Sequence, residues 1–176
     1  MLFSEILGQE HIKNHLQESA KKSRIPHAQL FVGKEGSGAL ATAIAYAQYL
    51  LCSENENSEA CNLKCDNLAH PDLHFAFPVT NNDKVKSPKK PVSNLFSEEW
   101  RQFIKEQPFG NLFNWLQFIG VENKQGNISV YEAEFIVKSL LLKSYEGGFK
   151  VMIIWMAEKM NISASNKLLK LIEEPP

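Results

Sequence analysis

The sequence predicts a three-layered α/β domain, in which helices cover the faces of a central sheet. The prediction rests on the alternation of short apolar runs with helical patterns along the chain. Three runs, 29–32, 72–78 and 149–155, have the composition of strands. Helical patterns lie between them, over about 40–50 and 129–144. The 176 residues show no internal repeat and are enough to bury one core.

The first half of the chain holds two predicted helices and two predicted strands. An amphipathic helix is expected from His11 to about Ser23, with Ile12 and Leu16 on its inner face. The run 29–32 is short and apolar enough for a buried strand, and the Ala-rich stretch 40–50 predicts the next helix. A polar loop is expected at 53–60, before the alternating second strand, 72–78.

The second half begins with a loop that is expected to be mobile, because residues 80–91 are polar and contain two prolines. Ser129 opens a capping-box pattern that predicts a helix to about residue 144. Gly147-Gly148 separates this helix from 149–155, the strongest strand pattern in the chain. A last helix is expected from 161 to 174, ended by Pro175-Pro176.

Aromatic residues are concentrated between 96 and 119, where seven of the eighteen in the chain lie. Two short helices are expected there, one beginning at Ser97 and one over about 111–118. The rings either pack inward as a local core or form an exposed face for a partner. The seven residues are Phe96, Trp100, Phe103, Phe109, Phe113, Trp115 and Phe118.

The loop after the first predicted strand has the glycine spacing of a phosphate-binding loop, G-x-x-x-x-G-K-[ST]. In such a loop, backbone N–H groups wrap the phosphates, the lysine neutralises charge and the hydroxyl ligates Mg²⁺. Gly33, Gly36 and Gly38 are in place, but Ala39 stands at the lysine position and Leu40 at the hydroxyl position. A plain tight turn is the alternative interpretation. The strand–loop–helix context favours a degenerate phosphate loop.

A second catalytic element is also altered. In nucleotide hydrolases of this class, an apolar strand delivers an Asp that organises the metal ion and a Glu that polarises water. Here the third predicted strand delivers Trp155 and Met156, and Glu158 lies two positions further on. Each charged hydrogen bond that is lost removes about 1.5–3 kcal/mol, so poor nucleotide affinity is expected.

Composition excludes several classes of protein. A net charge of −1 gives no global attraction to nucleic acid or acidic membranes. No apolar run approaches the roughly 20 residues of a membrane span, and the N-terminus has no signal-peptide pattern. The three cysteines are therefore expected to be reduced thiols in a cytoplasmic protein.

Several short motifs together resemble those of AAA+ clamp-loader subunits. They are Ile6-Leu7-Gly8-Gln9-Glu10, Ile25-Pro26-His27-Ala28-Gln29-Leu30-Phe31, the glycine loop, His70-Pro71-Asp72, Met156-Ala157-Glu158-Lys159-Met160 and the stretch from Asn166 to Pro176. The motifs cover nearly the whole chain except about 79–127, which is expected to be an insertion. The resemblance implies an AAA+-type P-loop NTPase fold, with three layers and a parallel sheet, in a truncated N-terminal domain over 1–176.

The resemblance further implies a sheet whose fourth strand lies between strands one and three and follows residue 176. We therefore expect an incomplete sheet. Either the run 29–32 closes onto 149–155, or another molecule fills the gap, because unpaired sheet edges recruit partners.

The function implied by the resemblance is that of a non-hydrolysing stator in the clamp loader of bacterial DNA polymerase III, a DNA-directed DNA polymerase. The loader places the sliding clamp on primed DNA at the expense of ATP. The expected partners are the delta and gamma/tau motor subunits, with no cofactor and no membrane. In the family, a stator lends its neighbour's ATP site an arginine from a loop that would follow residue 176, so no catalytic residue is assigned. A divergent ATPase and an independent DNA-binding module are the alternatives.

The cysteines raise the question of a metal site. Family members often carry a four-cysteine zinc module, and this chain offers Cys52, Cys61 and Cys65. The spacing of the last two suits a zinc ligand pair, but a fourth cysteine is missing. Three free thiols without a metal are expected. The alternative is a zinc site completed by Asp66, His70 or His74.

Two further groups of polar residues have structural and functional interpretations. His70 is expected to be structural, and Asp72 to cap or pin the loop at the entrance of the second strand. The lysines of the 80–91 loop are expected to be solvated, with a weak contact to DNA phosphates as the alternative. They are Lys84, Lys86, Lys89 and Lys90.

Overall fold

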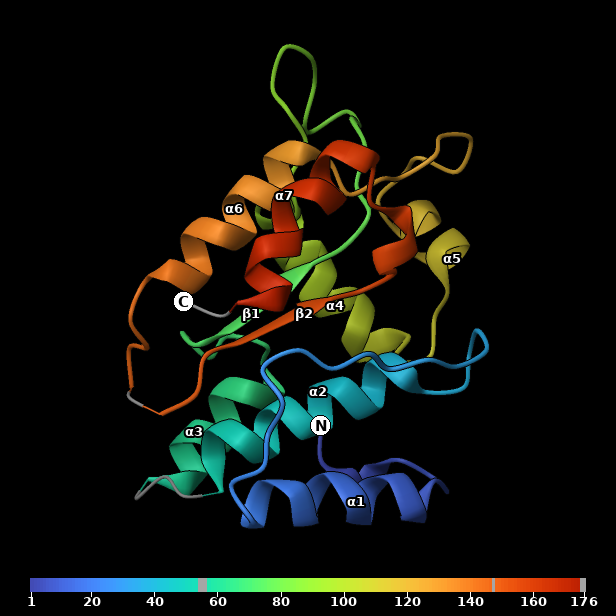
Figure 1. Ribbon diagram of the computed structural model, residues 1–176. Helices are drawn as coiled ribbons and strands as arrows, with labels where there is room; N and C mark the ends of the chain where they lie inside the picture. The colour runs from blue at the N-terminus through green and yellow to red at the C-terminus, as the bar shows by residue number, and fades with distance from the viewer. Residues whose placement is uncertain (54–56, 147, 175–176) are drawn as a thin grey trace. The chain divides into compact units, whose positions relative to one another are not determined.

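The computed structural model describes residues 1–53, 57–146 and 148–174. In this part of the chain the protein is a mixed α/β structure with seven α-helices and one small parallel sheet (Figure 1). The predicted break at Gly147 and the predicted helix stop at Pro175-Pro176 lie outside the described residues. None of the helices within those ranges is long and apolar enough to cross a membrane.

The chain forms two compact units, which are described separately. The first contains Met1–Leu73 and Ser144–Val151, and the second His74–Lys143 and Met152–Pro176. The expectation of a single truncated AAA+-like domain over 1–176 stays a prediction.

The first unit is helical. Its elements are the 3₁₀-helix η1 (Phe3–Glu5) and the helices α1 (Glu10–Lys21), α2 (Ala39–Cys52) and α3 (Ser58–Asp66). The predicted helices at 11–23 and 40–50 are therefore confirmed, whereas most of α3 was not predicted. The core of this unit lies between η1, α1 and α2, where Phe3, Leu16 and Tyr46 are buried.

The inner face of α1 differs from the prediction in one residue. Leu16 is buried as expected, but Ile12 is 44% exposed and Lys13 takes the inward position. The Lys13 ammonium donates to the backbone oxygen of Ile6 and lies 2.8 Å from Glu10 Oε1. Partners at the end of the side chain let its apolar stem be buried.

The predicted strand at 29–32 is wrong. This run has no regular secondary structure and pairs with neither strand of the sheet. Phe31 packs on Tyr46, with 6.5 Å between the ring centroids, while Leu30 and Val32 are 81% and 85% exposed. The expected closure of this run onto the third strand is therefore also wrong. A run of residues becomes a strand only when a neighbour takes up its hydrogen bonds, and neither strand of the described sheet does so.

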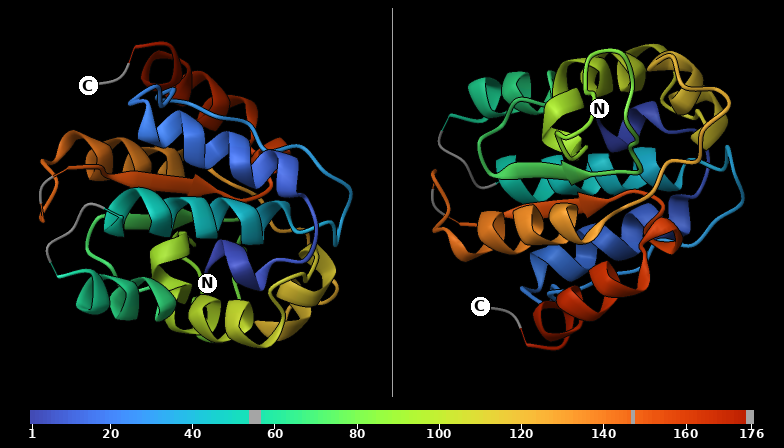
Figure 2. Two further views of the ribbon diagram at one scale, coloured as in Figure 1. Left: turned by 90° about the horizontal axis from the view of Figure 1, so that it is seen from below. Right: turned by 90° about the horizontal axis from the view of Figure 1, so that it is seen from above.

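The sheet consists of β1 (Leu73–Ala76) and β2 (Val151–Ile154). The amide of Val151 donates to Asp72 O at 2.8 Å, and that of Trp155 donates to Ala76 O at 2.8 Å. Both bonds have the same sequence offset, as parallel pairing requires. The two arrows point the same way in the right-hand view of Figure 2. The strands predicted at 72–78 and 149–155 are thus confirmed, in shorter form.

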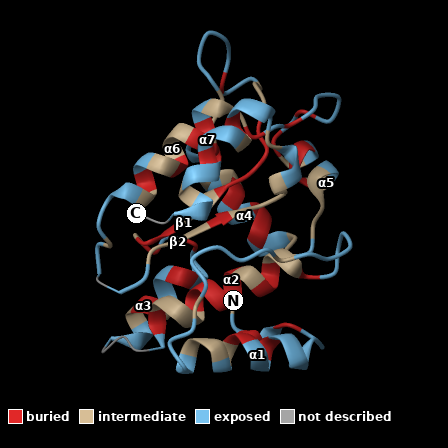
Figure 3. Ribbon diagram, viewed as in Figure 1, coloured by how far each residue is buried: buried red, intermediate tan, exposed pale blue. Residues whose placement is uncertain are grey.

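In the second unit, α6 (Val130–Leu141) and α7 (Ile162–Glu173) cover one face of the sheet. Asn161 caps α7 by accepting from the amide of Ala164 at 2.8 Å. The expected helices are confirmed, and together with the sheet they bury an apolar cluster (Figure 3). Its fully buried members are Ala76, Ala133, Ile136, Ala164 and Leu168.

The capping box predicted at Ser129 does not form, although α6 begins at the next residue. Ser129 Oγ is buried and has no hydrogen-bond partner. Glu132, which should complete the box, turns away instead, and its Oε2 accepts from the amide of Ser93 at 2.6 Å. A tertiary contact has replaced the local one. Burial raises the pKa of the Glu132 carboxyl to about 7.

The aromatic segment lies on the other face. It contains the 3₁₀-helix η2 (Ser93–Phe96) and the helices α4 (Ser97–Glu106) and α5 (Leu112–Phe118). Its rings pack inward around Trp100. The Trp100 ring stacks on that of Phe77, the residue directly after β1, with 4.0 Å between the ring centroids. The inward interpretation is confirmed for most of the seven residues, but Phe109 and Phe113 are 50% and 58% exposed.

The two ends predicted for the insertion lie side by side in this unit. Val79 and Asn127 exchange two backbone hydrogen bonds of 3.1 Å. The indole of Trp115 donates to Pro78 O at 2.8 Å and ties α5 to the same point. The chain thus leaves and re-enters the α/β framework at one place. That 79–127 is an insertion stays a prediction.

Candidate functional site

The glycine loop connects the run at 29–32 to α2 in the first unit. Gly36 and Gly38 have φ of 74° and 85°, in the left-handed region that disfavours residues with a Cβ. At Gly33 the constraint is space, because a Cβ there would lie 2.3 Å from Ser37 Oγ. Gln9 Nε2 donates to Ser37 O at 3.0 Å and links the loop to the start of α1. The conformation of the loop thus requires glycine at 36 and 38, whereas at 33 a side chain would require the Ser37 hydroxyl to shift.

The side chains that follow the loop carry no charge. Ala39 is the first residue of α2, with Gly38 at its N-cap, and Leu40 is the second. Thr42 is the first residue after the loop that carries a hydroxyl, but this hydroxyl donates to Gly38 O at 2.9 Å within the helix. The first turn of a helix attracts anions through its N–H groups. Here the N–H groups are not supplemented by a lysine at position 39 or by a hydroxyl at position 40, the metal-ligating position.

The strand end that should carry the catalytic carboxylates lies in the second unit and carries Trp155 instead. Its ring centroid lies 5.3 Å from that of Trp100 and 6.2 Å from that of Phe103, so it belongs to the aromatic cluster. Met156 follows in the left-handed region, at φ 56°, and precedes the 3₁₀-helix η3 (Ala157–Lys159). A carboxylate at position 155 would stand among aromatic rings, where an unpaired charge is costly.

These two parts of the predicted site belong to different units. The glycine loop lies in the first and Trp155 with Met156 in the second. Each is therefore characterised by its own surroundings, and their assignment as a degenerate nucleotide site stays a prediction.

A buried polar network in the first unit fixes the segment before β2. Asp72 accepts from the amides of Tyr145 and Glu146, at 2.7 and 2.9 Å. The predicted pinning was of the loop at the entrance of the strand at 72–78, whereas these bonds pin the segment before β2. His70 Nδ1 accepts from the amide of Asp72 at 3.1 Å, and its Nε2 lies 3.2 Å from Glu146 Oε2. Lys64 pairs with the same carboxylate and lowers its pKa. His70 is thus held by structural contacts.

Glu146 was missed by sequence reasoning. It lies more than seventy residues from His70 and Asp72, with which it shares the network. A glutamate in a loop has no periodicity or motif that would reveal such a contact. The only indication in the sequence was Asp72, whose predicted role at the strand entrance needs hydrogen-bond donors that the sequence does not identify.

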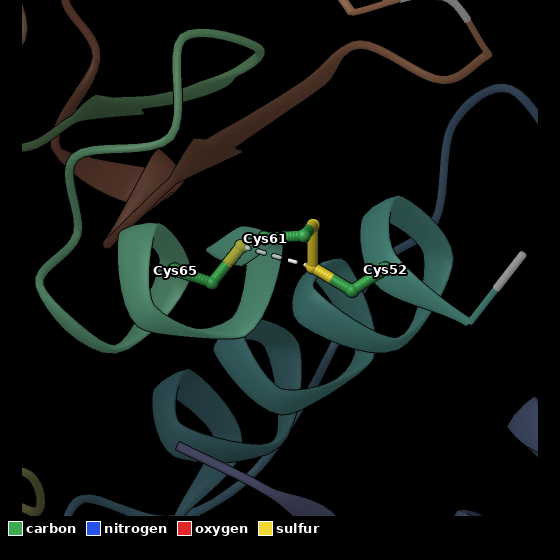
Figure 4. A group of neighbouring side chains, drawn as sticks. All are labelled: Cys52, Cys61 and Cys65. Carbon is green, nitrogen blue, oxygen red and sulfur yellow. Dashed lines mark hydrogen bonds between the residues drawn. A yellow bond between two sulfur atoms is a disulfide. The ribbon is translucent and has the colours of Figure 1, made fainter. Parts of the chain in front are cut away.

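The cysteines are also in the first unit, and the expectation of three free thiols is wrong. Cys52, at the end of α2, forms a disulfide with Cys61 of α3, and Cys65 is free and buried (Figure 4). The three sulfurs lie within 4.8 Å of one another. The turn between the two helices brings the cysteines together, a contact that the sequence spacing alone does not show.

The surroundings do not suit the zinc ion that the family resemblance suggests. A structural zinc needs four ligands with cysteines as thiolates, and two of the three sulfurs are joined to each other. Within the described ranges, the only side chains that gather here as possible metal ligands are the three cysteines, and no histidine or carboxylate joins them. Asp66 accepts instead from Gln48 at 3.1 Å, and His70 contacts Glu146.

Two of the four lysines of the 80–91 loop have carboxylate partners in the second unit, and a third lies over an aromatic ring. Lys84 lies 2.6 Å from Glu99 Oε1, a hydrogen bond that raises its pKa. Lys86 is 3.9 Å from Asp83, and the Lys90 ammonium lies 5.4 Å from the centre of the Tyr131 ring. These contacts reduce the positive charge that the loop offers to a phosphate backbone.

Comparison with known proteins gives a consistent result. The family model described as DNA polymerase III, delta subunit, matches residues 8–176. The delta' subunit of DNA polymerase III from Bacillus subtilis (strain 168) is 28% identical over 172 residues, 95% of this chain and 38% of that protein. The tau/gamma subunit from Haemophilus influenzae is 24% identical over 174 residues, 99% of this chain and 19% of its own length.

The gamma/tau subunit from Mycobacterium bovis is 35% identical over 176 residues, 99% of this chain and 23% of that protein. The chain therefore spans less than two fifths of the length of each of these relatives. No solved structure gives a significant match.

Proposed function

The chain belongs to the DNA polymerase III delta-subunit family, a clamp-loader family of DNA replication, and on this premise we propose that it is a stator that does not hydrolyse nucleotide. In this proposal the chain has an AAA+-type P-loop NTPase fold and supports ATP-dependent loading of the sliding clamp onto primed DNA. Its partners are the delta and gamma/tau subunits in the cytoplasm. The energy of ATP is supplied by the motor subunits.

The observation that carries the proposal is the contrast within the glycine loop. Glycine is kept at 33, 36 and 38, and the conformation at 36 and 38 needs it, while the side chains that would act on nucleotide are replaced by Ala39 and Leu40. A lysine and a metal-ligating hydroxyl make charged contacts worth about 1.5–3 kcal/mol each. Without them, backbone N–H groups alone must hold the phosphates.

The second support comes from Trp155. In a hydrolase, the end of this strand must present carboxylates to a metal ion and to water. Here the side chain is used for packing against Trp100 and Phe103. A carboxylate at position 155 would therefore lose the packing against Trp100 and Phe103. The residue that cannot act in catalysis is thus one that contributes to the stability of the fold.

Calorimetric titration of the full chain with MgATP tests the proposal. We expect no resolvable heat of binding up to about 1 mM nucleotide, the weak end of the affinity scale. The matched variant is the double substitution Ala39→Lys and Leu40→Thr, which restores both contacts on an unchanged backbone. It should bind at least ten times more tightly than the natural chain. Micromolar binding of MgATP by the natural chain would contradict the proposal.

A further inference from the structure

Two histidines stand four residues apart on α1 of the first unit. His11 lies in the first turn of this helix, and His15 lies one turn further on. Side chains at this spacing are neighbours on the same face of a helix, with about 5–6 Å between their Cβ atoms. The helix therefore holds the two imidazoles side by side before any ligand is present.

The face of α1 that carries the two histidines is open to solvent. Both residues are exposed, whereas Lys13 and Leu16 are buried on the inner side of the helix. Exposed stretches of α1 can be followed in Figure 3. In the part of the chain that the structure describes, neither imidazole takes part in a hydrogen bond or an ion pair. Their ring nitrogens are therefore available to a ligand from solution.

A carboxylate near the histidine pair favours a cation there. Glu18 follows His15 by three residues, on the same side of the helix. Its carboxylate accepts from Lys22 at 3.0 Å, and both side chains are more than half exposed, so their ion pair is weak. Among the described residues, Glu18 does not already converge with the two histidines on one point. The imidazole pair therefore defines the site, and Glu18 contributes its negative charge.

The chemistry of imidazole selects the kind of ion. Neutral imidazole nitrogens suit zinc, nickel and copper, whereas Mg²⁺ and Ca²⁺ prefer oxygen ligands. Two histidines at this helical spacing also bind zinc in the H-E-x-x-H helices of metalloproteases, where the glutamate acts as general base. Ile12 stands at the glutamate position here. The pair therefore has the ligands for binding a metal ion but not the base for hydrolysis.

We propose that His11 and His15 form a chelating site for one divalent transition-metal ion, Zn²⁺, Ni²⁺ or Cu²⁺, on the exposed face of α1. Each imidazole supplies one nitrogen ligand, and water fills the remaining coordination positions. The chelate requires the helical spacing, so the ion binds the folded chain more tightly than the unfolded chain and stabilises the fold. Its ligands are not those of the glycine loop, and the site does not depend on the proposed stator function.

Calorimetric titration of the full chain with NiCl₂ tests the site. The protein carries no polyhistidine tag, and the titration is made at neutral pH with MgCl₂ in excess. We expect one Ni²⁺ per chain with a dissociation constant of about 10–100 µM, which the Mg²⁺ does not change. His15→Gln leaves a single imidazole and should weaken Ni²⁺ binding at least about tenfold, because the advantage of two linked ligands is lost.

The matched control exchanges two exposed residues of α1, His11→Asn together with Asn14→His. This variant keeps the composition of the chain but places its two histidines at adjacent positions, which do not face each other on a helix. It should bind Ni²⁺ as weakly as His15→Gln. NiCl₂ should raise the urea midpoint of the natural chain and leave that of the control unchanged. Circular dichroism confirms that each variant is folded.

Three results would overturn the proposal. The first is equal affinity of the natural chain and the folded control for Ni²⁺. The second is the absence of any heat of binding up to about 1 mM NiCl₂. The third is loss of Ni²⁺ binding in folded Cys65→Ser, which keeps both histidines, because this loss would place the ion at the cysteines.

Discussion

At the scale of single residues, the informative positions are those where a side chain does something other than its motif requires. Trp155 is half-buried and packs against Trp100 where the motif needs a carboxylate, and Glu132 leaves a helix cap for a buried contact with Ser93. Ala39 fills the position of a lysine without disturbing the helix that begins there.

Trp155 gives the first prediction. Trp155→Asp should lower the free energy of unfolding by about 2–4 kcal/mol, since it removes a large ring and places a charge beside aromatic side chains. Trp155→Phe is the matched control and should cost less than half as much, because it keeps an aromatic ring. Urea denaturation of the three proteins measures both effects. Equal stability of the Asp variant and the natural chain would show that the ring is not part of the core.

Glu132 gives a prediction about pH. Its folded pKa of about 7 lies above the ordinary carboxyl value of 4.5, so the folded state holds a proton that the unfolded state has lost. The contribution of Glu132 to stability is therefore greatest below pH 4.5 and declines as the pH rises to about 7, by about 3 kcal/mol in total.

Glu132→Gln supplies the control for this pH dependence, because an amide oxygen can still accept from Ser93 but does not titrate. Denaturation midpoints between pH 5 and 8 should fall more for the natural chain than for the variant. Parallel curves for the two proteins would mean that the carboxyl titrates as it does in the unfolded chain.

At the scale of elements, local patterns were sufficient where the element makes its own hydrogen bonds. The helices α1, α2, α6 and α7 were predicted from amphipathic spacing, Ala-rich composition and signals at their ends. Such local signals suffice because a helix satisfies its backbone internally. The run at 29–32 has the composition of a strand but remains unpaired, because a strand needs a neighbour that sequence composition does not supply. Most of α3 was missed because its nine residues, most of them polar or small, show little amphipathicity.

Glycine positions in the candidate site were predictable, while the contacts that hold nearby segments were not. The spacing of Gly33, Gly36 and Gly38 reports directly on backbone conformation. The disulfide and the Asp72–Glu146 contact depend on how distant segments meet. No local pattern encodes such meetings, so they appear only in the folded structure.

The pinning of the segment before β2 gives a prediction at this scale. Asp72→Ala leaves the amides of Tyr145 and Glu146 without their acceptors and should cost about 2–4 kcal/mol of stability, as expected for hydrogen bonds to a charged group. Asp72→Asn keeps one acceptor oxygen and should cost about half as much. Hydrogen exchange of the two amides should accelerate in the same order. Unchanged protection in the Ala variant would contradict the pinning role.

At the scale of the whole molecule, the proposed stator function would explain why a subunit of this family can do without the side chains that act on nucleotide. A subunit of a clamp loader can act through its contacts with other subunits, and the matches to delta' and tau/gamma proteins support such contacts. The chain covers less than two fifths of these relatives, so its activity in an assembly is part of the proposal. The lysine loop supports a DNA role less well, because carboxylates partner two of its four lysines.

Assembly gives the prediction for the whole molecule. The full-length protein should co-elute with the delta and gamma/tau subunits in size-exclusion chromatography, and the natural loop and the Ala39→Lys, Leu40→Thr variant should assemble equally well. Assembly that depends on the loop substitutions would instead indicate that nucleotide binding by this subunit is needed.

Phosphate release from ATP is the most direct test of a stator that does not hydrolyse nucleotide. The assay compares the full-length protein alone, the motor subunits alone, and the reconstituted loader with primed DNA and clamp. We predict no turnover above background for the protein alone, and turnover in the loader that is unchanged when Trp155 is replaced by Phe. Steady ATP hydrolysis by the isolated protein, abolished by a substitution within its own glycine loop, would contradict the stator function.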